Sequence, residues 1–191
     1  MSKGKILLVC KNYFDDSSVS KYNQHLSSFL ISKGFSVNVI SFDDFVSELG
    51  FKEFKIVSDI QKTDEVVFRD WLMLLNTKLK LMGEDLHRKE GFNLIHCSDW
   101  QVYPSCLLLK DSLNVPLVLS FFNAHSLNDS EYSRVVKEFE LIGINNADTV
   151  LVSDEDLSLK VNNDNVKIID PILIDWQHRV LKEYERVMNR N

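Results

Sequence analysis

Short apolar segments of four to six residues alternate along this chain with longer segments of helical periodicity. The short segments are rich in Val, Ile and Leu, which is typical of strands buried on both faces. A chain that alternates strand and helix returns to the same edge of the sheet before each new strand, so its strands run parallel. The sequence therefore predicts an α/β fold: a single-domain, Rossmann-like doubly wound parallel sheet with helices on both faces. The strand candidates are residues 5–10, 36–41, 93–97, 116–120, 149–152 and 166–169, and the helix candidates are residues 20–33, 64–89, 101–113, 131–146 and 155–161.

One domain accounts for the length and composition of the chain. Its 191 residues, 45% of them hydrophobic, suit a single globular domain with a sizeable core. Near the end, four apolar residues recur at intervals of four, four and three, which places them on one helical face. We expect residues 1–174 to form the domain and residues 175–191 to form a closing helix packed on it. The four apolar residues are Trp176, Val180, Tyr184 and Val187.

Charge and composition exclude several classes of protein. The formal net charge is −6, and the 22 Lys and Arg residues are scattered among 28 Asp and Glu residues, so the chain lacks the clustered basic surface that nucleic acid binding requires. The early apolar run at residues 6–10 is far shorter than a secretion signal or a membrane span, which predicts a cytoplasmic protein with no membrane span. The glycine-rich fingerprint of dinucleotide enzymes and the nucleophile elbow of serine hydrolases are both absent. We expect no cofactor.

The cysteines and histidines do not predict a metal site. Cys10, Cys97 and Cys106 lie in or beside apolar segments without CxxC spacing, so we expect reduced, buried thiols. A zinc site built from His96, Cys97 and His125 would need a further convergent ligand and tighter pair spacing. We therefore expect no metal.

Polar residues follow four of the strand candidates. In a parallel sheet the carboxyl ends of the strands meet at one edge, where ligands bind. The polar segments supply carboxylates, histidines, an amide and aromatic rings, which suit a hydroxyl-rich ligand because polar groups pair with hydroxyls while rings stack on sugar faces. The alternative is that Asp99 and Ser153 only cap the helices behind them. The four segments are residues 11–20, 98–100, 121–125 and 153–155.

The segment IHCSDW at residues 95–100 resembles the IHAHDW segment of glycogen and starch synthases and related GT-B glycosyltransferases. Three further segments are similar to parts of these enzymes in the same order. Residues 5–42 match the first strand, loop, helix and second strand, residues 115–125 match a strand ending in T-x-H-N, and residues 147–157 match an A-D-x-V segment. The resemblance implies that residues 1–174 form the N-terminal, acceptor-side domain of such an enzyme, which is one half of a GT-B fold.

The resemblance also implies a function and a site. Enzymes of this family transfer sugar from a nucleotide sugar to a hydroxyl of an oligosaccharide or glucan. His96 and Asp99 would hold the acceptor, and we predict both as catalytic residues. The predicted ligand-binding residues are Ser17, Ser18, Ser98, Trp100, Asn123, His125 and Ser153.

The sequence departs from the family pattern on the donor side. After the first strand the family has a Lys-x-Gly-Gly loop whose backbone amides approach the donor's phosphates. Here residues 15–19 read DDSSV, and the two carboxylates would repel a pyrophosphate. Ser98 and Phe122 stand where the family has histidines, and neither can carry positive charge. His125 lies three residues beyond Phe122, where it can enter the vacated space or remain a surface histidine.

Three hypotheses about function follow from the expectation that this chain lacks the family's second domain. That domain holds most of the nucleotide-sugar site, and we expect no room for it after residue 175, although residues 174–188 resemble the terminal helix that returns from it. In the first hypothesis, this lobe pairs with a separate donor-domain polypeptide as a split glycosyltransferase. In the second it is a non-catalytic carbohydrate-binding or regulatory module, and in the third an interaction scaffold, since a fold does not imply a function. We expect the isolated chain to be inactive, and a homo-oligomer stays open.

Overall fold

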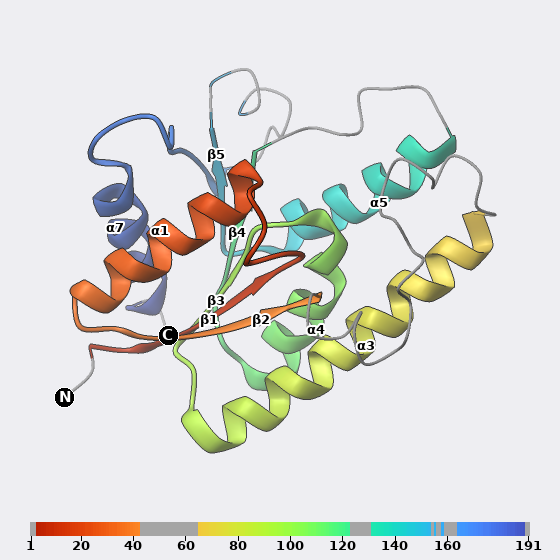
Figure 1. The fold of residues 1–191 in the computed structure, drawn as a ribbon, viewed down its shortest axis with the longest axis horizontal. Coiled ribbons are helices and arrows are strands. Elements are labelled where there is room, and N and C mark those ends of the chain that lie inside the picture. Colours follow the sequence, from red (N-terminus) through yellow and green to blue (C-terminus); the bar gives the residue numbers. More distant parts are fainter. Residues whose placement is uncertain are drawn as a thin grey trace.

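A parallel sheet forms the middle of the molecule (Figure 1). The computed structural model describes residues 3–42, 65–122, 131–153, 155, 158 and 164–189. The strands of this part are β1 (Lys5–Cys10), β2 (Ser36–Ser41), β3 (Leu94–Cys97), β4 (Leu117–Phe121), β5 (Thr149–Val152) and β6 (Val166–Ile168). They form one six-stranded sheet in the order β2-β1-β3-β4-β5-β6, and every neighbouring pair is parallel. The predicted α/β fold with a parallel sheet is confirmed.

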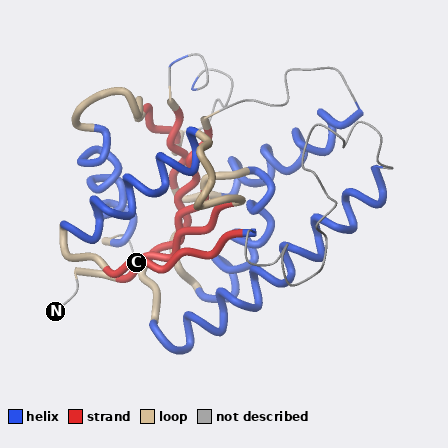
Figure 2. The backbone as a smooth tube through the Cα atoms, in the orientation of Figure 1, coloured by secondary structure: helices blue, strands red, loops and turns tan. Residues whose placement is uncertain are grey.

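Helices cover both faces of this sheet, as Figure 2 shows. They are α1 (Ser18–Ser32), α3 (Glu65–Glu90), the short 3₁₀ helix η2 (Trp100–Val102), α4 (Tyr103–Leu113), α5 (Glu131–Asn146) and α7 (Trp176–Met188). Ile6 and Leu94 of the sheet pack against α1 and α7 on one face, while Leu7 and Ile95 pack against α3, α4 and α5 on the other. Successive side chains of a strand point to opposite faces, so an unbroken apolar strand fills both cores. The doubly wound arrangement is confirmed.

Helix α7 directs its apolar stripe at the sheet. Trp176, Val180, Tyr184 and Val187 are all buried, and the most exposed of them, Trp176, has 9% of its surface accessible. The Trp176 ring also stacks on the Tyr22 ring of α1, with the ring centres 4.8 Å apart. The regular spacing in the sequence therefore corresponds to the face that α7 turns to the core.

A chain of hydrogen bonds crosses the core on this face. His96 of β3 has no exposed surface, and its Nδ1 lies 2.5 Å from the Tyr184 hydroxyl of α7. Its Nε2 lies 3.1 Å from Oγ of Ser120 on β4, and that Oγ lies 3.0 Å from the Tyr22 hydroxyl of α1. Burial lowers the pKa of His96 to about 3, so the ring is neutral and each nitrogen has one partner. These bonds tie α1 and α7 to the two central strands.

We predict that Tyr184→Phe lowers the free energy of unfolding by about 1–3 kcal/mol, because it leaves the buried Nδ1 of His96 without a partner. Urea unfolding measures the change. A double-mutant cycle with His96→Leu serves as the control: because the two side chains share one hydrogen bond, losing both costs less than the sum of the single losses. Strictly additive losses would contradict this hydrogen bond.

Candidate functional site

Two adjoining pockets lie where the carboxyl ends of the strands meet. The outer pocket has a volume of about 410 Å³, and the inner pocket, of about 30 Å³, has room for a water molecule. Val19 of α1 and Phe122, which follows β4, line both pockets, so the pockets share a wall. The outer pocket is also lined by Ser18, Tyr22, Ser153, Asp170, Pro171 and Ile172, and the inner pocket by residues that include Ser98, Asp99, Trp100, Tyr103, Ser120 and Glu140.

The outer pocket combines hydroxyl groups, a carboxylate and aromatic rings. Ser18 is the first residue of α1, and Ser153 directly follows β5. Asp170 comes after β6, and its Oδ1 accepts a hydrogen bond at 2.9 Å from the backbone N–H two residues further on. The Tyr22 and Phe122 rings meet edge to face with their centres 4.6 Å apart. The pocket therefore offers hydrogen-bond donors and acceptors beside apolar ring surfaces.

The inner pocket holds a carboxyl group that burial makes less acidic. Oδ2 of Asp99 accepts a hydrogen bond from the Lys11 N–H at 2.8 Å, and no capping bond joins this side chain to η2. Asp99 thus connects the ends of β1 and β3, and the alternative that it only caps a helix does not hold. Burial raises the pKa of Asp99 to about 6, against the opposing effect of the Lys11 N–H and with a contribution from the charge of Asp15. Beside it, Oγ of Ser98 accepts a hydrogen bond from the Asn23 amide at 2.8 Å.

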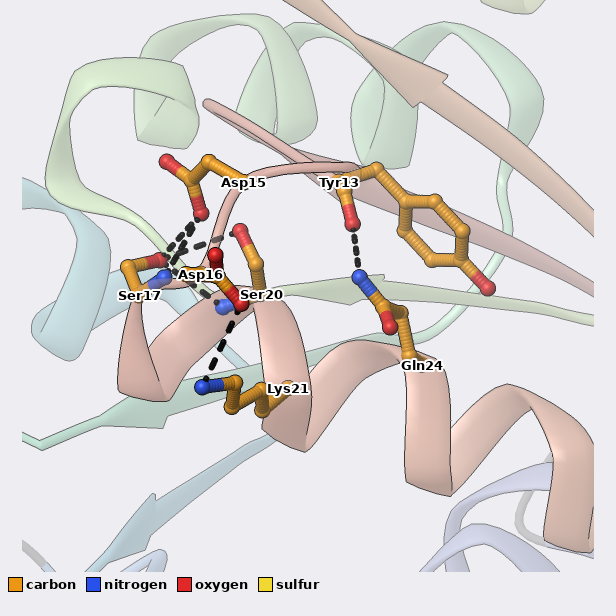
Figure 3. Close-up of polar contacts among 7 residues, drawn as sticks. All are labelled: Tyr13, Asp15, Asp16, Ser17, Ser20, Lys21 and Gln24. Atoms are coloured by element: carbon orange, nitrogen blue, oxygen red, sulfur yellow. Dashed lines mark hydrogen bonds and ion pairs between the residues drawn. The ribbon is translucent and has the colours of Figure 1, made fainter.

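A second carboxylate lies beside the start of α1 (Figure 3). Ser17 is the N-cap of this helix, and its Oγ accepts a hydrogen bond from the Ser20 N–H at 3.2 Å. Oδ1 of Asp15 accepts hydrogen bonds from the Ser17 N–H at 3.0 Å and from the Ser17 hydroxyl at 2.6 Å, and Oδ2 accepts one from the Asn12 amide at 2.7 Å. Burial raises the pKa of Asp15, but its hydrogen bonds outweigh this effect and hold the pKa well below its usual range. Asp15 is therefore ionised at every pH at which the protein is expected to work.

Most of the predicted site residues meet at this edge of the sheet. Ser18 and Ser153 line the outer pocket, and residues 98–100 line the inner pocket. Ser17 lies next to them, but its hydroxyl is engaged by Asp15 and by the first turn of α1. Parallel strands end at one edge, which is why residues from separate parts of the chain come together here.

Other predicted residues are placed differently. His96 lines neither pocket, and it has no exposed atom with which to touch a ligand. Asn123 and His125 lie outside the described residues. The sequence analysis missed Tyr22 and Asp170, although Asp170 follows its strand as closely as Ser153 does, and Tyr22 lies about one helical turn into α1.

Within the described part of the chain, no group of three or more His, Cys, Asp or Glu side chains is arranged to hold a metal ion. Cys10, Cys97 and Cys106 are free and buried, as expected from the sequence. None of the described helices is both long and apolar enough to cross a membrane.

Comparisons with known proteins give matches among solved structures alone: no protein-family model and no curated protein matches the sequence. A chain of sucrose-phosphate synthase from Thermosynechococcus elongatus matches with a TM-score of 0.61 and 16% identity over 97% of this chain and 98% of that chain. A second chain of that enzyme matches with a TM-score of 0.65 and 16% identity over 87% of this chain and 48% of that chain. The S. aureus MnaA–UDP structure matches with a TM-score of 0.55 and 15% identity over 87% of this chain and 43% of that chain.

These neighbours have the GT-B fold. The chain has the fold of one half of a GT-B protein. It spans about half the length of the second and third neighbours, at 48% and 43%. Identities of 15% and 16% show the fold alone. The closer resemblance to an N-terminal lobe of the glycogen or starch synthase type stays a prediction.

The raised pKa of Asp99 predicts how stability depends on pH. The folded protein holds the Asp99 proton up to about pH 6, whereas the unfolded chain loses it near the ordinary value of 3.8. Stability should therefore fall as pH rises across this window, by up to about 3 kcal/mol at about 1.4 kcal/mol per pKa unit. Asp99→Asn keeps an oxygen for the Lys11 N–H and removes the titrating group.

Urea unfolding of the wild type and of Asp99→Asn, followed from about pH 4 to about pH 7, checks this prediction. The stability difference between the two proteins is the readout, because all other carboxyl groups titrate in both. Asp99→Asn should gain stability relative to the wild type as pH rises. Parallel pH profiles would show that the folded and unfolded states bind the Asp99 proton equally.

Proposed function

We propose that this chain is the acceptor-side lobe of a glycosyltransferase: it binds an oligosaccharide or glucan in the outer pocket and needs a separate donor lobe for sugar transfer. The outer pocket carries the proposal, because it gathers hydroxyls, a carboxylate and rings at the edge where parallel sheets bind ligands. Its volume of about 410 Å³ is within the range of small-molecule sites. The GT-B fold of the structural neighbours is consistent with this function and does not by itself establish it.

The chemistry of the outer pocket matches the surface of a sugar. A sugar ring has an apolar face of C–H groups, which can stack on the half-buried ring of Phe122. Its hydroxyls both donate and accept hydrogen bonds, as do the hydroxyls of Ser18 and Ser153. The carboxylate of Asp170 can also accept hydrogen bonds from sugar hydroxyls, and a charged acceptor forms the stronger bond.

The inner pocket supplies the residues closest to a reaction. In this proposal Asp99 holds an acceptor hydroxyl, and its pKa of about 6 suits proton exchange near neutral pH. Ser98 and Trp100, next to Asp99, contact the same acceptor sugar. His96 acts through Ser120 as a positioning residue rather than by touching the sugar.

One observation supports a separate donor lobe. The loops at the carboxyl edge expose large apolar side chains: Phe14 is 78% exposed, Ile172 is 91% exposed and Ile174 is fully exposed. Exposed apolar patches commonly mark protein interfaces. We propose that the donor lobe covers this edge.

One observation favours the second candidate function, a non-catalytic carbohydrate-binding or regulatory module. The ionised carboxylate of Asp15 lies at the start of α1, where the family's glycine loop would admit the donor's phosphates. A lobe that binds saccharides but does not catalyse sugar transfer would keep the pockets and would no longer need to admit the nucleotide-sugar donor. Asn123 and His125 stay in both proposals on the resemblance alone.

We predict that the purified chain binds maltotriose and that Ser18→Ala weakens binding about 2- to 10-fold, the effect of one lost hydrogen bond between neutral groups. Asp170→Asn should weaken binding further, because it removes a charged acceptor. Titration calorimetry measures the Kd. Ser32→Ala, a serine at the other end of α1, is the matched control and should leave the Kd unchanged. The absence of binding to maltotriose and to a panel of other glucans would rule out both carbohydrate functions and leave the scaffold hypothesis.

We predict that affinity purification at native expression level recovers a stoichiometric partner polypeptide with a nucleotide-sugar-binding lobe. Ile172→Asp combined with Ile174→Asp should abolish recovery, because charged side chains are costly in an apolar interface. Leu81→Asp is the control, since Leu81 is 56% exposed on α3, away from the carboxyl edge. Recovery of the chain alone would remove the split-enzyme model and leave the carbohydrate-binding module.

A further inference from the structure

We infer that the outer pocket selects saccharides without phosphate or other anionic groups, and that Asp15 is the residue that determines this selectivity. The inference rests on the proposed saccharide binding and adds the charge class of the ligand. It applies equally to a split enzyme and to a non-catalytic module.

The start of α1 is the place on this edge where an anion would ordinarily bind. A helix N-terminus presents unpaired N–H groups and the positive end of the helix dipole, which together attract phosphate. Here Ser18 and Val19, the first residues of α1, line the outer pocket, so a phosphate on a bound sugar could reach this helix end.

The protein supplies its own anion at that position. Asp15 accepts the Ser17 N–H at 3.0 Å and the Ser17 hydroxyl at 2.6 Å, while Oγ of Ser17 takes the Ser20 N–H at 3.2 Å (Figure 3). The Ser17 N–H, the Ser17 hydroxyl and the Ser20 N–H, three of the groups that a phosphate could use at this helix end, are therefore engaged within the chain. The hydrogen bond from Asn12 at 2.7 Å fixes the second oxygen of the same carboxylate.

The remaining charges of the site reinforce the exclusion of anions. None of the described residues that line the outer pocket is Lys, Arg or His, and Asp170 adds a carboxylate to its wall. Of the nearby cations, Lys21 pairs with Asp16 at 3.4 Å (Figure 3), and the positive charge of Lys11 acts on Asp99. The guanidinium of Arg179 lies at the end of β6, where it donates a hydrogen bond to the Ile168 carbonyl at 3.0 Å. A phosphorylated sugar would therefore meet the carboxylate of Asp170 in the pocket and that of Asp15 beside the start of α1, and none of the described lining residues is a cation.

The same carboxylates can attract a neutral sugar. Ionised carboxylates are acceptors only, and sugar hydroxyls are donors, so Asp170 can bind a neutral saccharide at the point where it repels a phosphate. Repulsion between charges at a protein surface is screened by salt over about 8–10 Å at ordinary ionic strength. The discrimination should therefore be large in low salt and smaller in high salt.

Calorimetric titration with maltose and with maltose 6′-phosphate, a pair that differs by one phosphate, tests the inference. In the wild type at low salt, the phosphorylated sugar should bind at least about tenfold more weakly, and added salt should narrow the gap. Asp15→Asn removes the charge and keeps an oxygen for the Ser17 N–H, and Asn is favoured in such turns. In this variant the Kd values of the two sugars should differ only about threefold. Asp111→Asn, which removes an exposed charge from α4, should leave the difference between the two Kd values unchanged.

The possible results separate this inference from the proposed function. Equal binding of both sugars to the wild type at low salt would overturn the inference and leave saccharide binding intact. The role of Asp15 would be overturned if the wild type binds maltose 6′-phosphate more weakly than maltose and Asp15→Asn shows the same difference in affinity. The variant must unfold normally for this result to count. If neither these sugars nor any glucan binds, the proposed function fails and the inference fails with it.

Discussion

The two hydrogen bonds of His96 hold the arrangement on which the rest of this structure depends. A neutral imidazole without any contact to water needs one partner for each ring nitrogen, since an unpaired buried polar group is costly. The Tyr184 hydroxyl and Oγ of Ser120 are those partners, at 2.5 and 3.1 Å. Oγ of Ser120 is also hydrogen-bonded to the Tyr22 hydroxyl. Tyr22 lines the outer pocket, and its ring stacks on Trp176. A pair of bonds in the core thus fixes α1 and α7, and the pocket opens beside the start of α1.

The pocket that results has a definite chemical character. It presents hydroxyls and carboxylates as hydrogen-bond partners and aromatic rings as stacking surfaces, and the start of α1 beside it is occupied by the protein's own Asp15. In the proposed function such a site favours a neutral, hydroxyl-rich acceptor over a phosphorylated one. The anionic donor would then bind to groups of a separate lobe, for which we propose the exposed apolar residues Phe14, Ile172 and Ile174 at the same edge as the contact surface.

Much of the fold could be predicted because its determinants are local. Unbroken apolar runs between helical segments indicate parallel strands, and the strands and most helices begin and end within about two residues of the predicted ranges. Helix α7 ends at Met188 rather than at 191, and the helix predicted at residues 155–161 lies largely outside the described residues. Ser18, Asp99 and Ser153 were predicted at one edge because each follows a strand. The position of His96 could not be predicted, since its two partners lie 24 and 88 residues away in sequence. The expected repulsion between Asp15 and phosphate stays a prediction. The hydrogen bonds of Asp15 to the helix start depend on loop geometry that residue types alone do not determine.

Amide NMR spectra recorded during a titration with maltotriose test the central claim most directly, because they locate a ligand as well as detect it. The account predicts that the signals of Ser18, Val19, Ser153 and Ile172, around the outer pocket, shift with one common Kd. Signals at the opposite edge of the sheet, such as those of Asn93 and Asn114, should stay in place. Shifts confined to that opposite edge, or no shift at a saturating concentration of any glucan, would contradict the claim that this edge of the sheet is a carbohydrate site.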